Sequence, residues 1–203
     1  MSSASPLAVS ALLIALTLLL SGCSESPNKA GTATTVGASD QGYLRDRIER
    51  IGEQVDTWAE AETIERARVA AEAAANLIVG PNGPGYGDRN RDGQLAGEAE
   101  TGLLPGIDGT PEGLALPHAS NICIARDVLG GSWSEPQAAW DSMEAAIAAW
   151  EPGNNTMPTL PSHPMRVVGW ATFTLESDSL QEAHEYASHA SLHVSISSRA
   201  LDC

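Results

Sequence analysis

The clearest helical pattern in the chain is LQEAHEYASHASLHVSISSRAL, residues 180–201. Its small and apolar residues recur at alternating steps of three and four, so they share one stripe of a helix. They are Leu180, Ala183, Ala187, Ala190, Val194, Ser197 and Leu201. Three heptads of this spacing predict an amphipathic helix that buries its stripe against other helices, as in a helical bundle.

Residues 43–79 carry two further stripes of the same period. The first comprises Leu44, Ile48, Ile51, Val55 and Trp58. The second comprises Ile64, Ala67, Ala71, Ala74 and Ile78. Because the second stripe is out of phase with the first, we expect either one long helix with a phase change or two helices that meet near Glu60.

Shorter helices are expected later in the chain, at residues 118–129 and 135–150. Residues 165–175 are ambiguous, since their β-branched residues favour a strand while the helical neighbourhood favours a helix, which we prefer. Residues 80–117 are rich in glycine and proline and lack a period, and such long loops in compact domains are often functional. The predicted fold class is mainly α, a helical bundle with a long Gly/Pro-rich loop.

The N-terminus contains an apolar run, Leu7 to Leu20, followed by Ser21-Gly22-Cys23. Fourteen residues in a helix reach about 21 Å, which is too short to cross a bilayer comfortably. The run and its Leu-Ser-Gly-Cys ending resemble the lipobox signal of bacterial lipoproteins. The resemblance implies cleavage before Cys23 and a lipid, such as palmitate, on its thiol. An ordinary secretory signal cut nearby without lipidation is the alternative.

The lipoprotein resemblance also implies a cellular location and a division of the chain into segments. We expect an extracytoplasmic protein in the cell envelope, anchored to the outer membrane where there is one and otherwise to the outer face of the plasma membrane. Residues 1–22 are then a signal peptide, and 23–41 are the lipidated cysteine and a small, polar, flexible tether. Residues 42–203 are long enough for a single helical domain with a sizeable core.

Composition limits the partners. The chain has 26 acidic and 11 basic residues, and nucleic-acid binding needs clustered lysine and arginine, so nucleic acid is excluded as a partner. If Cys23 carries the lipid, Cys123 and Cys203 are the only pair left for a disulfide, which an oxidising compartment favours. Two buried free thiols are the alternative.

One local motif carries cation chemistry. Asp88, Asn90, Asp92 and Gly93 stand at positions 1, 3, 5 and 6 of a loop that resembles the EF-hand and dockerin calcium loops. Gln94 would supply its backbone carbonyl at position 7. Calcium is therefore the cofactor that the resemblance implies, with a Kd of about 10⁻⁴ to 10⁻³ M. A turn stabilised only by its own Asx hydrogen bonds is the alternative.

The second half of the motif departs from that pattern, because Ala99 occupies position 12. Glu98 and Glu100 flank it, so either would close the ligand shell after a register shift, and Asp108 is a remote candidate. The segment that leads into the loop, residues 76–87, also resembles segments of uncharacterised exported helical proteins of bacteria. That resemblance implies no activity.

A second metal hypothesis concerns the helix at residues 180–201. Glu185, His189 and His193 follow at steps of four, so they form a column on one face, and imidazole suits zinc or copper. The predicted buried stripe runs elsewhere on this helix, so a solvated face is the competing interpretation. No catalytic signature such as Gly-x-Ser-x-Gly occurs, and we do not expect an enzyme.

The sequence thus predicts a lipid-anchored binding or structural protein with a calcium-stabilised loop. Its partner would be an unknown protein or small ligand, besides the membrane reached through the anchor. The alternative is a lipoprotein that binds or delivers zinc or copper through Glu185, His189 and His193.

Overall fold

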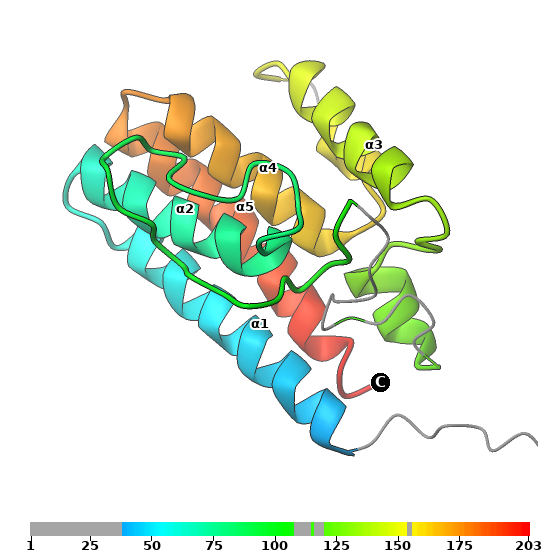
Figure 1. The fold of residues 1–203 in the computed structure, drawn as a ribbon. Helices are drawn as coiled ribbons and strands as arrows, with labels where there is room; N and C mark the ends of the chain where they lie inside the picture. The colour runs from blue at the N-terminus through cyan, green and yellow to red at the C-terminus, as the bar shows by residue number, and fades with distance from the viewer. Residues whose placement is uncertain (1–37, 108–114, 116–119, 154–155) are drawn as a thin grey trace, which may run out of the picture. The chain divides into compact units, whose positions relative to one another are not determined.

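A computed structural model describes residues 38–107, 115, 120–153 and 156–203 (Figure 1). The predicted lipidation site Cys23, the first part of the tether and Asp108 lie outside the described residues. Within them the protein is mainly helical, with no strand, as predicted. No helix in these ranges is both long and apolar enough to cross a membrane.

Four helices form the bundle: α1 (Ala38–Ala59), α2 (Ile64–Val79), α4 (His163–Glu176) and α5 (Leu180–Arg199). α1 packs against α2 and α5, and α4 packs against the same two helices. Figure 1 shows the four lying side by side. The helical bundle predicted from the sequence is confirmed.

The phase change near Glu60 is a break between two helices. α1 ends at Ala59, and α2 starts after Thr63, whose hydroxyl accepts a hydrogen bond from the Arg66 N–H at 3.3 Å. This is an N-cap, which satisfies a backbone donor that the first helical turn leaves free. α1 begins at Ala38, before the predicted domain boundary at residue 42, so the last residues of the predicted tether are helical.

α5 buries nearly the stripe that its sequence predicts. Ala183, Ala187 and Ala190 are fully buried, and these small side chains let the neighbouring helices approach closely. One turn later the stripe shifts, since His193 is buried and Val194 is only partly so. The ambiguous segment at residues 165–175 lies within α4 and is helical, as we preferred.

The chain between α2 and α4 holds the remaining elements: η1 (Ile124–Val128), α3 (Pro136–Ala148) and η2 (Met157–Thr159). η1 lies within the short helix predicted at residues 118–129 and is a single π-type turn, in which the Leu129 N–H donates to the Ile124 carbonyl five residues back. A disulfide joins Cys123, next to η1, to Cys203 beyond the end of α5, with their Cα atoms 6.1 Å apart. It fastens the C-terminus to this intervening segment.

Candidate functional site

The first part of the long loop, residues 80–107, lies against α2 (Figure 1). The Leu103 and Leu104 N–H groups donate to the Leu77 and Ile78 carbonyls at 3.2 and 3.0 Å, so the loop pairs with the last turn of the helix. Gly97, with φ of +72°, approaches so closely that a Cβ there would lie 2.3 Å from the Ala73 carbonyl oxygen. The loop is therefore tightly applied to the helix.

A buried carboxylate on α2 organises the loop. Glu72 is fully buried, and its two oxygens accept three backbone N–H bonds from the loop. Oε2 accepts from Arg89 and Asn90 at 2.8 and 2.9 Å, and Oε1 accepts from Ala96 at 2.8 Å. Charge-assisted bonds of this kind are about twice as strong as neutral ones. Glu72 thus fixes the start of the predicted calcium motif and its ninth position, Ala96.

Asn76, one turn further along α2, makes the second attachment. Its side chain is also fully buried; it donates to the Gly87 and Ala96 carbonyls at 2.9 and 2.8 Å and accepts from the Gly87 N–H at 3.2 Å. We refer to Glu72 and Asn76 together as the clamp. The clamp presents a loop of fixed geometry on the surface of the bundle.

Between these attachments, the oxygens of the predicted calcium ligands turn toward one another's backbone. The Asp92 N–H donates to Asp88 Oδ1 and Asn90 Oδ1 at 3.1 and 2.9 Å, and the Gly93 N–H donates to Asp88 Oδ2 at 2.8 Å. Two positive φ angles, +63° at Arg91 and +86° at Gly93, bend the chain around this point. The first three predicted ligands are therefore gathered within one turn.

The predicted ligands of the second half are arranged differently. The Gln94 N–H donates to Asp92 Oδ1 at 2.8 Å, which keeps Gln94 in the turn. Glu98 and Glu100 are exposed on either side of Ala99, whose backbone bonds to the Tyr86 hydroxyl. Among the described residues no three His, Cys, Asp or Glu side chains are grouped to hold a metal, so these glutamates do not join Asp88 and Asp92.

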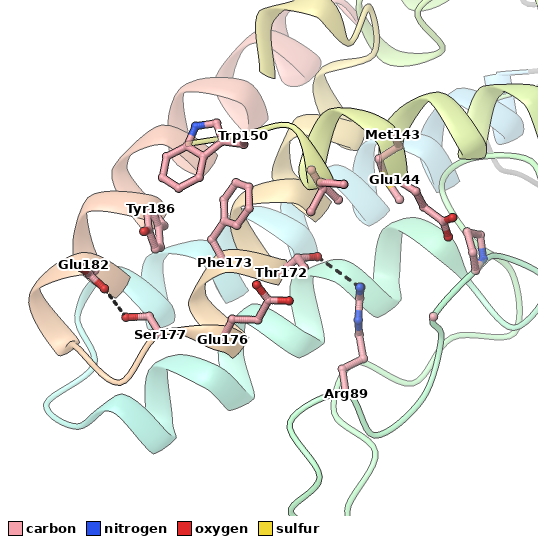
Figure 2. Close-up of a pocket in the computed structure, with 14 residues that line it drawn as sticks. Arg89, Met143, Glu144, Trp150, Thr172, Phe173, Glu176, Ser177, Glu182 and Tyr186 are labelled. Carbon is pink, nitrogen blue, oxygen red and sulfur yellow. Dashed lines mark hydrogen bonds between the residues drawn. The ribbon is translucent and has the colours of Figure 1, made fainter. Parts of the chain in front are cut away.

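A pocket of about 720 Å³ adjoins the loop, between α3, α4 and α5 (Figure 2). One wall is aromatic: Trp150 stacks on Phe173 with ring centroids 4.3 Å apart and meets Tyr186 edge-on at 6.0 Å. Three carboxylates, Glu144, Glu176 and Glu182, also line it. We call this the aromatic pocket. Its volume falls in the range of small-molecule sites.

Arg89 connects the loop to the aromatic pocket. Its backbone N–H is held by Glu72, while its guanidinium reaches α4, where Nη2 lies 3.4 Å from Thr172 Oγ1 (Figure 2). Burial lowers the pKa of Arg89, and the nearby Glu72 opposes that shift. A guanidinium nevertheless keeps its proton in proteins. Arg89, which stands at position 2 of the motif, therefore places a positive charge at the pocket wall.

The alternative metal residues do not converge in the described part of the chain. Glu185 and His189 are exposed, and the His189 ring stacks on Trp170 with centroids 4.4 Å apart. His193 is turned inward instead, with Nδ1 2.9 Å from Nδ1 of His163. Burial, and then the neighbouring His163, lower the pKa of His193 to about 3, so His193 is neutral at physiological pH. Burial also lowers the pKa of His163.

Sequence reasoning missed the clamp and the role of Arg89. The clamp does leave a signal, because Glu72 and Asn76 are the polar residues of the otherwise apolar segment 70–79, and they stand four apart on one helix face. No neighbouring residue in the sequence predicts where the Arg89 side chain lies, because its position depends on packing between the loop and α4. No protein-family model matches the chain, and no curated protein or solved structure matches it significantly.

Proposed function

We propose that the chain is a lipid-anchored, extracytoplasmic binding protein of the bacterial cell envelope, with a clamped loop that binds calcium and the aromatic pocket as its ligand site. The observation that carries the proposal is the clamp, which fixes an oxygen-rich turn on one side and Arg89 on the other. The loop thereby links a cation site to a pocket wall.

The chemistry of the turn supports calcium. Asp88, Asn90 and Asp92 bring hard oxygen donors into a single turn, and the Gln94 carbonyl and water would complete the shell. Because the clamp fixes the loop independently of any ion, little ordering entropy is lost when calcium binds. With only two formal charges among these ligands, the affinity should resemble that of extracellular modules, about 10⁻⁴ to 10⁻³ M.

Calcium should raise the melting temperature of the full-length protein. At about 10 mM calcium and a Kd of about 1 mM, mass action gives about 1.4 kcal/mol of stabilisation. For a domain of this size, that is an increase of about 3 to 6 °C. Asp92→Asn should abolish most of the increase, because it removes a ligand charge while keeping an oxygen for the Gln94 N–H. Thermal melts monitored by circular dichroism measure this.

The control variant is Asp56→Asn, which removes the same charge from an exposed position on α1. It should respond to calcium like the wild type. Magnesium at equal ionic strength is the second control, since the 15 net negative charges of the chain make any divalent cation stabilising to some degree. Equal responses to the two ions, or an unchanged response in Asp92→Asn, would contradict calcium binding at this turn.

The anchor is tested separately. In cells, the wild-type chain should partition into the detergent phase after Triton X-114 extraction, because a lipidated cysteine binds membranes. Cys23→Ser should move the mature protein to the aqueous phase or leave its precursor uncleaved. Cys123→Ser is the matched control and should still partition into detergent. A wild-type protein found in the aqueous phase would favour an ordinary secretory signal.

A further inference from the structure

A second pocket, of about 440 Å³, lies on the other side of Arg89. Arg68 of α2, the loop segment 89–91, and Thr172, Leu175 and Glu176 of α4 line it. Arg89, Thr172 and Glu176 line the aromatic pocket too, so the two pockets share a wall. We call this second one the arginine pocket.

The arginine pocket concentrates positive charge in an acidic protein. It takes three arginines from a chain with 11 basic and 26 acidic residues. Only Glu176 among the lining residues is negative, so the lining carries a net charge of plus two, or plus one when Asp178, the ion-pair partner of Arg68, is counted with it. In a protein that is acidic overall, such a local concentration of positive charge attracts anions.

The Arg89 guanidinium has an unsatisfied donor and no ion pair in the described part of the chain. Its Nη1 atom is buried without a hydrogen bond, and no carboxylate forms an ion pair with this guanidinium within 4.0 Å. Glu72, whose charge acts on Arg89, already accepts three backbone N–H bonds. A buried donor left without a hydrogen bond is costly to the fold. An anion in the pocket would remove that cost.

The other two arginines have free donors as well. Arg68 uses Nη2 for Asp178 and the Ser177 carbonyl, both at 2.7 Å, but its Nε is buried without a partner. Arg91 is exposed at the rim. Guanidinium groups approaching from a helix and a loop suit an oxyanion that has several acceptor oxygens.

We propose that the arginine pocket binds a phosphate group, the anionic part of a ligand whose remainder occupies the aromatic pocket. The inference deepens the binding function proposed above and rests on it. Free phosphate and a phosphomonoester share the recognising chemistry. The shared wall favours the ester, because an aromatic or apolar body attached to the phosphate would reach Trp150 and Phe173.

The test uses the full-length protein in a non-ionic detergent, titrated with inorganic phosphate and with phenyl phosphate in calcium-free buffer. Chloride at matched ionic strength is the reference, since screening alone stabilises an acidic protein. Both phosphates should give saturable binding by calorimetry and raise the melting temperature above the chloride reference. Tighter binding of phenyl phosphate supports the ester, and equal binding supports the free anion. A response to neither would overturn the proposal.

Three variants localise the response. Arg89→Met should weaken phosphate binding at least about tenfold, which is the loss expected for a charge-assisted contact. It should also raise the melting temperature in chloride, because it removes a buried donor that has no hydrogen bond. Arg91→Asn removes the rim charge with a residue that tolerates a positive φ, and it should also weaken binding. Arg66→Gln, exposed on α2, is the control and should bind like the wild type. Unchanged affinity in both Arg89→Met and Arg91→Asn would overturn the site.

The two proposals fail in distinguishable ways. Calcium and phosphate are titrated separately, and Asp92→Asn is carried through both titrations. Loss of phosphate binding in the arginine variants with the calcium response intact confirms the arginine pocket independently of the turn. A calcium response without any phosphate binding in the wild type contradicts the arginine pocket alone, and the reverse pattern contradicts the calcium turn alone.

Discussion

Glu72→Ala should destabilise the protein by about 3 kcal/mol or more. The substitution removes the acceptor for three backbone N–H groups, those of Arg89, Asn90 and Ala96. Each buried donor left without a partner costs about 1 to 3 kcal/mol, and water entering the vacated space recovers part of that cost. Urea unfolding of the full-length protein measures the change in the free energy of unfolding.

A finer variant and a control make the result specific. Glu72→Gln keeps the shape but turns an amide N–H toward one of the backbone donors, so it should cost about 1 to 3 kcal/mol. Glu53→Gln, exposed on α1, should stay within about 0.5 kcal/mol of the wild type. Hydrogen exchange should accelerate at the amides of Arg89, Asn90 and Ala96 in both Glu72 variants. Wild-type stability and exchange in Glu72→Ala would contradict the clamp.

Removing the disulfide should have the second large effect. The bridge between Cys123 and Cys203 spans a sequence separation of 80 residues. In the chain-entropy model, closing a loop of that length restricts the unfolded chain by about 4 to 5 kcal/mol, although measured values are often lower. Cys203→Ser should therefore lower the free energy of unfolding by about 2 to 5 kcal/mol.

Reduction of the wild type with dithiothreitol should reproduce that loss, because Cys203 is exposed and accessible to a reductant. Cys23→Ser is the control and should leave the stability unchanged, since it keeps both partners of the bridge. A non-reducing tryptic digest should yield one linked peptide pair containing Cys123 and Cys203. Two alkylatable thiols at these positions in the native protein would contradict the bridge and favour the free-thiol alternative.

The bundle was predictable because three of its four helices, α1, α2 and α5, each repeat an apolar period. The stripe from Ala183 to Ala190 and the phase change at Glu60 follow from spacing alone. The π-type turn at η1 was not predictable, because it depends on how Ile124 and Leu129 fit the surrounding segment. His193 is buried where Val194 was expected to be, because His193 faces His163 of another helix. The local sequence pattern does not reveal this contact.

The candidate site was predictable only in part. The spacing of Asp88, Asn90 and Asp92 indicated a turn lined with oxygens, and the structure gathers these side chains in one turn. The clamp and the arginine pocket depend on contacts between residues far apart in the sequence, such as Glu72 with Ala96 and Arg89 with Thr172. The pattern of a single sequence reveals periods among neighbouring residues. Contacts between residues far apart in the sequence leave no such period, so they could not be predicted from it.

The most direct test of the central claim, that calcium binds the clamped turn, is a calcium titration of the ¹⁵N-labelled full-length protein by NMR. The amide signals of Asp88 to Gln94 should shift together and saturate, with one Kd of about 10⁻⁴ to 10⁻³ M. Signals from the exposed face of α1 should shift little. Amide signals of the turn that stay in place, or that drift linearly without saturation along with those of α1, would contradict the claim.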